Sequence, residues 1–237
     1  MFLIGTLVNG LLIIIGTLLG KLFHQIPENI KGTVMHAIGL AVMVLGLQMS
    51  FKGENFLVVI LSLVFGAVLG EYFALEDKLT VLGDWLESKI GSKGQGSISQ
   101  GFVTATLIFV IGAMSILGAL DSGIRGDHSV LYTKSIIDGF TALILTTTLG
   151  IGVLFSAVPV ILYQGLIALF AMQIDRFVPP EFMNSFIKEI TATGGVMLFA
   201  IGLNLAGITK IRVANLLPSI VVTGIAVTGI YFYKLYF

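Results

Sequence analysis

Long apolar stretches separated by short polar segments run through almost the whole chain. A helix needs about 20 mostly apolar residues to cross the hydrocarbon core of a bilayer. The pattern therefore predicts an all-α bundle of about eight membrane-spanning helices, forming a single integral membrane domain over residues 1–237. The expected spans cover residues 2–23, 33–51, 56–74, 101–120, 135–157, 160–174, 186–206 and 214–233.

The fifth and sixth expected spans form one long apolar run that is divided only by Pro159. The run is too long for a single span, even a tilted one. Two helices joined by a tight turn fit this length best, and a re-entrant pair is the alternative.

Two polar stretches, residues 76–98 and 121–134, are expected outside the hydrocarbon region. The first carries apolar residues at helical spacing, which predicts an amphipathic helix lying on the membrane surface. These residues are Leu75, Leu79, Leu82, Leu86 and Ile90. The following stretch, Gly91 to Gly96, is typical of a flexible linker. Neither stretch is long enough for a folded soluble domain.

The second and seventh expected spans resemble one another without gaps. Gly39 aligns with Gly195, Gly46 with Gly202, and the amide Gln48 with Asn204. We therefore predict that residues 1–75 recur as residues 157–237, around a central segment 76–156. With eight spans the two copies would have opposite orientations, an architecture that recurs in secondary transporters. A chance alignment of glycine-containing apolar helices is the alternative.

Composition supports the membrane assignment. The chain is 56% hydrophobic and 11% charged, with no net charge, whereas soluble proteins carry roughly 25% charged residues. No basic cluster is available for nucleic acid, and the absence of cysteine excludes disulfides and thiolate chemistry. The basic residues divide almost equally between the two predicted sides, so the positive-inside rule favours an outside N-terminus only slightly.

Polar residues inside the spans are the candidates for function, because burying an unpaired polar group in lipid costs several kcal/mol. Asn9 lies in the first span, Ser115 in the fourth, Asn204 near the end of the seventh and Asn215 at the start of the eighth. Each could contribute to a substrate or ion pathway, or could form a hydrogen bond between helices.

The densest candidate region lies in the middle of the chain. The glycine-rich segment from Gly112 to Gly123 contains Ser115 and Asp121, and its composition favours a broken helix. Lys134 and Asp138 follow, four residues apart, and can pair on one helix face. A carboxylate at Asp138 could bind a cation or carry a proton. An interfacial ion pair that anchors the helix end is the alternative.

Small residues suggest two further features. Adjacent Gly194 and Gly195, after Thr193, weaken a helix by about 1 kcal/mol each, so an unwound stretch could present backbone groups to a substrate. Close helix packing is the rival interpretation. The stripes Gly16–Gly20 and Ser62–Gly66–Gly70 predict close helix contacts within the chain, with dimerisation as the alternative.

No catalytic constellation is evident. The histidines are scattered without metal-ligand spacing, and the chain shows no phosphate loop, hydrolase elbow or zinc-protease helix. We therefore expect neither an enzyme nor a protein with a metal or other cofactor.

Several motifs together resemble one known family. They are Gly5 to Asn9, Gly112 to Leu120, Lys134 to Gly139, Asn204, and Asn215 to Pro218. Over essentially the whole chain, the sequence resembles the YdfK/YqgA-type bacterial membrane proteins, grouped as domain-of-unknown-function family 554. This resemblance implies a multi-pass protein of the bacterial inner membrane. It implies no substrate and no functional residues.

The leading functional hypothesis is a secondary transporter or channel-like protein for a small solute or ion. A non-transporting membrane scaffold or partner protein is the alternative, because it explains the same glycines as packing. The expected partners are the lipid bilayer, the solute or ion, and a second copy of the chain if it forms a homo-oligomer.

Overall fold

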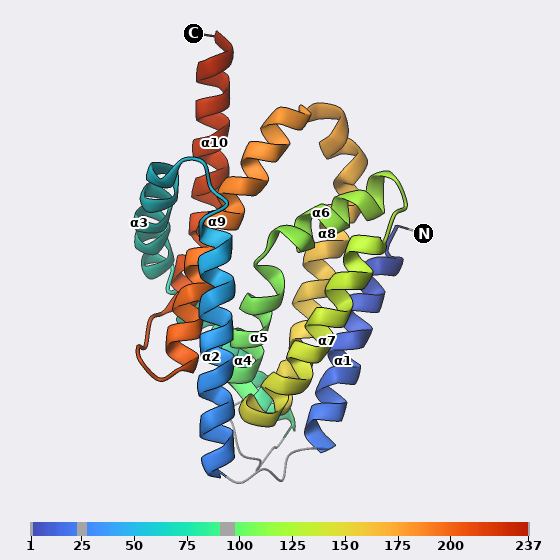
Figure 1. The fold of residues 1–237 in the computed structure, drawn as a ribbon, viewed down its shortest axis with the longest axis vertical. Coiled ribbons are helices and arrows are strands. Elements are labelled where there is room, and N and C mark those ends of the chain that lie inside the picture. Colours follow the sequence, from blue (N-terminus) through green and yellow to red (C-terminus); the bar gives the residue numbers. More distant parts are fainter. Residues whose placement is uncertain (1, 23–27, 91–97, 237) are drawn as a thin grey trace. The chain divides into compact units, whose positions relative to one another are not determined.

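The computed structural model describes residues 2–22, 28–90 and 98–236, and the described part is helical without a strand (Figure 1). The linker expected at residues 91–96 lies outside the described residues. The elements in chain order are α1 (Ile4–Leu22), α2 (Glu28–Ser50), α3 (Phe56–Tyr72), α4 (Leu75–Ile90), α5 (Ile98–Val110), α6 (Ala113–Ile124), α7 (Ser129–Leu149), the 3₁₀ turn η1 (Ile151–Ser156), α8 (Ala157–Phe177), α9 (Pro180–Leu205), the 3₁₀ turn η2 (Val213–Leu216) and α10 (Pro218–Tyr236).

The helices form two compact units. The first unit consists of Met1–Met35, Lys78–Val110 and Met114–Ile174, and therefore holds α1, α5, α6, α7 and most of α4 and α8. The second unit consists of His36–Asp77, Ile111–Ala113 and Asp175–Phe237, and holds most of α2 together with α3, α9 and α10.

Among the described residues, five helical segments are long and apolar enough to cross a membrane, and the number rises to seven if two bent helix pairs each count as one span. The bent pairs are α3 with α4, and α5 with α6. Seven of the eight expected spans correspond to these segments, and the remaining one is α7, a helix of 21 residues that carries Lys134 and Asp138. The prediction of eight spans thus depends on α7.

Helix α1 is arranged with its polar and small residues inside and its large apolar residues outside. Thr6, Asn9 and Gly16 are buried, whereas Leu7 and Leu11 are 50% and 54% exposed. Such a helix is suited to a lipid environment, because lipid accepts the apolar face while the protein interior covers the polar and small residues.

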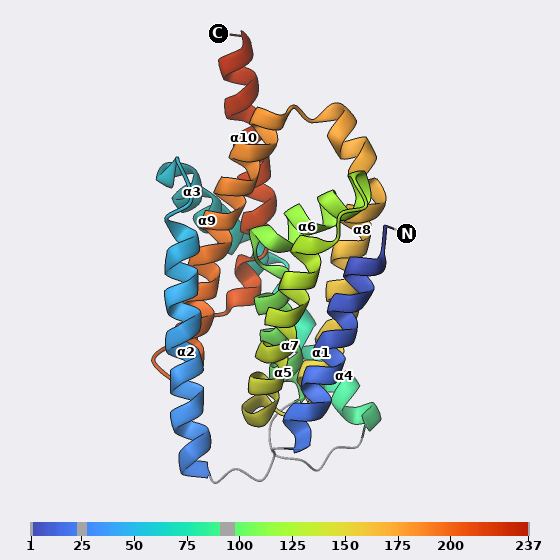
Figure 2. The same cartoon turned by 45° about the vertical axis from the view of Figure 1, so that its right-hand side comes forward.

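In the first unit, α1 and α7 lie side by side in both views (Figures 1 and 2). Gly16 packs against the backbone of Gly139, and Gly20 packs against Leu143 and Thr146. A side chain at Gly16 or Gly20 would collide with α7 backbone. The stripe Gly16–Gly20 is therefore used for packing inside the chain, as predicted.

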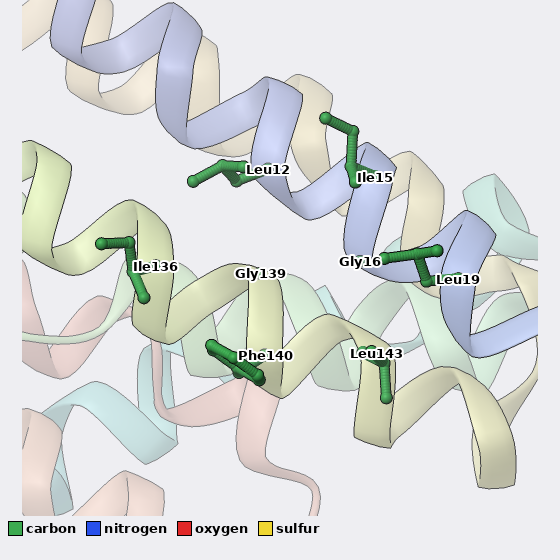
Figure 3. Close-up of a pocket in the computed structure, with 8 residues that line it drawn as sticks. All are labelled: Leu12, Ile15, Gly16, Leu19, Ile136, Gly139, Phe140 and Leu143. Atoms are coloured by element: carbon green, nitrogen blue, oxygen red, sulfur yellow. The ribbon is translucent and has the colours of Figure 1, made fainter.

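The same glycines leave an apolar groove between α1 and α7, with a volume of about 210 Å³. Figure 3 shows that only aliphatic and aromatic side chains and two glycines line it. The lining residues are Leu12, Ile15, Gly16, Leu19, Ile136, Gly139, Phe140 and Leu143. None of the candidate polar residues contributes to this groove, so it is not the candidate site.

In the second unit, α2 and α9 pack through glycines on both helices. A Cβ atom added to Gly46 would lie 2.6 Å from the carbonyl oxygen of Gly195, and one added to Gly39 would lie 2.9 Å from that of Gly202. Because the lower number on α2 meets the higher number on α9, the two helices are antiparallel. On the neighbouring pair, Gly66 of α3 packs against Ser219 of α10.

Candidate functional site

An ion pair buried in the first unit forms the centre of the candidate site. Lys134 and Asp138 lie one helical turn apart on α7, so their side chains share a face. The Nζ atom of Lys134 is 2.6 Å from Oδ2 of Asp138, and the two side chains are 8% and 6% exposed. The pair is thus an interior feature and not an exposed anchor at the helix end.

Asn9 of α1 connects this pair to a second helix. Its Nδ2 atom donates to Oδ2 of Asp138 at 3.1 Å and to Oε1 of Gln164 at 3.3 Å. Gln164 lies on α8 and is completely buried, as is Asn9. The carboxylate of Asp138 therefore accepts hydrogen bonds from side chains of two helices.

Gln164 continues the network to a helix break. Its Nε2 donates to Oγ of Ser115 at 3.4 Å, and Ser115 Oγ donates to the carbonyl oxygen of Phe109 at 3.1 Å. The chain bends by 61° between α5 and α6, and Gly112 at the break has a φ of 150°. Because the last carbonyls of a helix have no intrahelical partner, Ser115 supplies the donor that Phe109 lacks.

We call these five side chains the polar network: Asn9, Ser115, Lys134, Asp138 and Gln164. They come from α1, α6, α7 and α8, and all are buried. Its two charges cancel, which limits the cost of burying them. The network leaves Oδ1 of Asn9 buried without a hydrogen-bond partner.

The structure thus brings together four of the residues predicted from the sequence, Asn9, Ser115, Lys134 and Asp138. The prediction of a broken helix in the glycine-rich segment is confirmed. Gln164 was missed, although it is an amide inside a long apolar run, the criterion that identified Asn9. Asp121 does not join the network; it is 3.7 Å from Arg125 in a partly exposed ion pair.

The prediction of an unwound stretch at Thr193 to Gly195 is wrong. Helix α9 is continuous from Pro180 to Leu205. Gly195 contacts the backbone of α2, and Oγ1 of Thr193 lies 2.9 Å from Oγ1 of Thr223 on α10. Gly194 meets the side chain of Ile111. The rival interpretation of close helix packing is confirmed, because a Cβ at Gly195 would overlap α2.

Asn204 and Asn215 stabilise loops of the second unit. The side-chain oxygen of Asn204 accepts from the backbone N–H of Ile211 at 2.8 Å, and its amide donates to the Ile211 carbonyl at 2.7 Å. Asn215 donates to Glu71 and accepts from the backbone N–H of Glu76 at 2.7 Å. Asn204 fastens the loop that follows its own helix, whereas Asn215 connects η2 to α3 and α4 and so forms the hydrogen bond between helical elements that was the alternative.

Arg212 reinforces the same loop at the surface by pairing with Asp77 and Glu71. The hydrogen bond that Arg212 donates to Asp77 and the negative charges around the guanidinium raise the pKa of Arg212 above its ordinary value. This group is exposed, so its ion pairs contribute little to stability.

Comparison with known proteins places the chain in a family. The family model described as "Protein of unknown function (DUF554)" matches residues 4–228. The chain belongs to the DUF554 family. It is 30% identical to the "Uncharacterized membrane protein YdfK" of Bacillus subtilis (strain 168) over 238 residues, covering 98% of this chain and 99% of the relative. It is 31% identical to the "Uncharacterized protein YqgA" of Escherichia coli (strain K12) over 222 residues, covering 92% of this chain and 93% of the relative. No solved structure matches.

Membership of the DUF554 family confirms the resemblance noted from the sequence. One relative is described as a membrane protein, and this chain has five to seven apolar segments that can cross a bilayer. The DUF554 chain is therefore a multi-pass membrane protein. The family descriptions attach no substrate or activity to the polar network, so its chemistry must be argued from the geometry.

A second buried acid in this DUF554 protein was not among the predicted sites. Glu189 on α9 is 5% exposed, and its Oε1 accepts the backbone N–H groups of Glu54 and Asn55 at 2.8 and 2.9 Å. The neighbouring Lys188 faces outward and pairs with Glu54 at 2.5 Å, whereas Glu189 turns inward and holds the loop between α2 and α3.

Metal binding has no support within the described part of the chain. No group of three or more His, Asp or Glu residues there could hold a metal ion. Asp138, Glu54 and Glu71 pair with Lys or Arg side chains, and Glu189 accepts backbone N–H groups.

Proposed function

We propose that this protein is a secondary transporter or channel for a small solute or ion in the bacterial inner membrane. The observation that carries the proposal is the buried pair of Lys134 and Asp138, joined through Asn9 and Gln164 to the α5–α6 break. Ionisable residues inside membrane proteins are costly, and they commonly mark ion pathways and proton relays.

The helix break supports the same function. Non-helical backbone at membrane depth is tolerated where it is buried in protein or lines a cavity, and broken helices commonly form the binding sites of secondary transporters. Here the carbonyl of Phe109, near the end of α5, accepts a hydrogen bond from Ser115, which belongs to the polar network. The backbone at the break is thus coupled through hydrogen bonds to the ion pair of Lys134 and Asp138.

The antiparallel packing of α2 against α9 is compatible with an inverted repeat. The alignment equates Gly39 with Gly195 and Gly46 with Gly202. If the copies are related by a two-fold axis, a contact between Gly39 and Gly202 requires one between Gly195 and Gly46. Both contacts are present. A two-fold axis perpendicular to two antiparallel helices relates copies of opposite orientation, which matches the expectation from the sequence.

The first helices of the two proposed copies also meet. Asn9 of α1 and Gln164 of α8 are separated by 155 positions, close to the offset that aligns α2 with α9. In addition, each copy contributes its first helix to the first unit and its other two helices to the second unit. Transporter sites commonly lie where inverted repeats meet, and the polar network is such a place.

The rival function is a scaffold or partner protein without a transport pathway. It is favoured by the direct pairing of Lys134 with Asp138, since a purely structural buried pair would have the same geometry. In this reading the network fixes the packing of α1, α7 and α8 and nothing passes through it.

The test is transport by purified protein in liposomes that contain a trapped pH dye or a cation dye. Proton, Na⁺ and K⁺ gradients are imposed in turn, and dye signals are compared with those of protein-free liposomes. We expect wild-type protein to accelerate at least one flux, and Asp138→Asn to reduce it to the protein-free rate. Asp84→Asn is the matched control, because Asp84 is exposed on α4.

Equal rates in wild-type and protein-free liposomes under all three gradients would contradict ion transport. Recovery of a stoichiometric partner protein from solubilised membranes would then favour the scaffold.

A further inference from the structure

The hydrogen bonds of the polar network run in one direction. Lys134 and Asn9 both donate to Oδ2 of Asp138. From Asn9 the chain of donors continues to Gln164, from Gln164 to Ser115, and from Ser115 to the carbonyl of Phe109. This order suits an ionised Asp138, because an ionised carboxylate can only accept hydrogen bonds.

The unpartnered oxygen of Asn9 indicates that the hydrogen bonds of the polar network can also run in the opposite direction. Oδ1 of Asn9 is buried without a partner, although Nδ2 on the same carboxamide donates twice. Rotation of the carboxamide by a half-turn exchanges the two atoms, which are nearly equal in size. A protonated Asp138 has an O–H group to donate, and the rotated Asn9 would present Oδ1 to accept it. Asn9 can therefore donate to the ionised form of Asp138 and accept from its protonated form, and in the rotated state its Nδ2 takes the buried position that Oδ1 held.

The rotation has a consequence at Gln164. After it, Oδ1 of Asn9 would face Oε1 of Gln164, and two acceptors repel each other. Rotation of the Gln164 carboxamide removes the conflict, since Nε2 then donates to Asn9 and Oε1 faces Ser115. The Ser115 hydroxyl has one proton, so donating it to Gln164 leaves the carbonyl of Phe109 without its donor.

We propose that this site binds a proton on Asp138 and transmits the binding to the α5–α6 break through Asn9, Gln164 and Ser115. The proton adds to a carboxylate oxygen, and no other covalent bond changes. The three bonds between the neighbouring side chains are kept with reversed direction, and the Phe109 carbonyl is released. The one net charge of the protonated site is the Lys134 ammonium.

The groups around Asp138 allow this assignment. Other titratable groups on the helices that contribute to the polar network are Lys21 of α1, Asp121 of α6, Tyr132 of α7, and Tyr163, Asp175 and Arg176 of α8, and His128 precedes α7. Asp121 pairs with Arg125, and His128 lies 2.6 Å from Ser122. Within the described residues, Lys134 is the single charged group bonded to Asp138. Titration of Asp138 would therefore act through the polar network.

Proton binding is tested by isotope-edited infrared spectroscopy on protein labelled at aspartate carboxyl carbons and reconstituted in liposomes. We expect a protonated-carboxyl band that appears as the pH falls, is lost in Asp138→Asn and persists in Asp84→Asn. The proposal would be overturned if the wild-type protein showed no protonated-carboxyl band that titrates with pH and is lost in Asp138→Asn.

Transmission is tested with a fluorophore at the break. The chain has no cysteine, so Met114→Cys, at a side chain 36% exposed on α6, gives a single labelling position. We expect its signal to change with pH in parallel with the infrared band. Asp138→Asn, which is neutral like the protonated acid, should give the low-pH signal at every pH.

Gln164→Leu separates the two parts of the proposal. It removes the link to Ser115 but leaves Lys134, Asp138 and Asn9, so the infrared band should remain while the pH response of the fluorophore is lost. A response that survives in Gln164→Leu would overturn the relay. If Asp138→Asn does not fold, the infrared band of the wild-type protein still tests proton binding. The fluorophore response of Gln164→Leu still tests transmission.

Proton binding at Asp138 does not depend on the proposed function; only the use of that proton in transport rests on it. A titrating Asp138 in a protein that moves no ion would retain proton binding and exclude transport. Transport that is unaffected by pH, without an Asp138 band, would exclude the proton and retain the transporter.

Discussion

The side-chain amide of Asn9 donates to the side-chain oxygen of Gln164 across 3.3 Å, and so joins α1 to α8 inside the first unit. The two residues lie far apart in the sequence, and each is a polar residue within an apolar helix. Neither carries charge, yet their contact connects the ion pair on α7 to the break between α5 and α6. Removing either amide should thus affect both features.

Replacing Gln164 by leucine should destabilise the protein by about 1–3 kcal/mol, because buried donors and acceptors on Asn9 and Ser115 lose a partner. Gln173→Leu is the matched control on the same helix, since Gln173 is exposed, and should change stability by less than about 0.5 kcal/mol. Denaturation in mild detergent, followed by circular dichroism, measures the difference. Equal effects of the two substitutions would contradict the buried network.

Removing one charge of the ion pair should destabilise the protein more than removing both charges. Asp138→Leu leaves the Lys134 ammonium buried without a counter-ion, which should cost about 3–5 kcal/mol. The double variant Lys134→Met/Asp138→Leu should recover most of this loss, because replacing a buried pair by apolar residues is often neutral. The same denaturation assay, run as a double-mutant cycle, gives the coupling energy. A double variant as unstable as the sum of the single ones would show that the pair is not coupled.

Gly46→Ala should destabilise the second unit by about 1–3 kcal/mol, because overpacking forces backbone shifts. Its added Cβ would lie 2.6 Å from the Gly195 carbonyl oxygen. Gly229→Ala on α10, where no atom lies within 4 Å of the added Cβ, should instead stabilise by about 0.5–1 kcal/mol through reduced backbone entropy. Thermal unfolding in detergent distinguishes the two, and the order of their midpoints is the decisive result.

Glu189→Ala should loosen the loop between α2 and α3. Its carboxylate oxygen accepts the N–H groups of Glu54 and Asn55, and leaving such donors without a partner costs about 1–3 kcal/mol. Hydrogen–deuterium exchange should therefore show lost protection at these two amides. Glu181→Ala, at an exposed position in the first turn of the same helix, should leave them protected. Unchanged exchange in Glu189→Ala would exclude the loop-holding role.

The surface pair of Glu54 and Lys188 should give a small, pH-dependent effect. The hydrogen bond and the positive charge of Lys188 lower the pKa of Glu54 from its ordinary value of 4.5. Because a lowered folded-state pKa favours the ionised form, the contribution is present above pH 4.5 and is lost as the pH falls through the folded pKa. The stability difference between wild type and Lys188→Met should thus disappear in acid and in high salt. A stability difference that persists below the folded-state pKa of Glu54 would assign the effect of Lys188 to packing.

Much of the polar network could be predicted because the membrane environment makes polar residues conspicuous. Asn9, Ser115 and Asp138 each stand in an apolar run, and the four-residue spacing of Lys134 and Asp138 fixes their pairing. Their convergence could not be predicted, since it depends on how α1, α6 and α7 pack. Gln164 was available to the same argument and was overlooked.

Glycine was the ambiguous signal. Gly112 marks a real break, with positive φ, whereas Gly194 and Gly195 lie inside the continuous helix α9. Composition alone does not separate a glycine required by the backbone from one required by a neighbouring helix. For Gly195 the deciding partner is α2, more than a hundred residues earlier in the chain.

The reciprocal contacts between α2 and α9 have a consequence for the origin of the chain. If residues 1–75 and 157–237 are inverted copies, as proposed, they descend from a duplicated gene whose product inserted into the membrane in both directions and paired with itself. Such an ancestor could carry little charge bias between its two ends, because a strong bias would have fixed one direction. The nearly even division of basic residues along this chain is the trace that such an ancestor would leave.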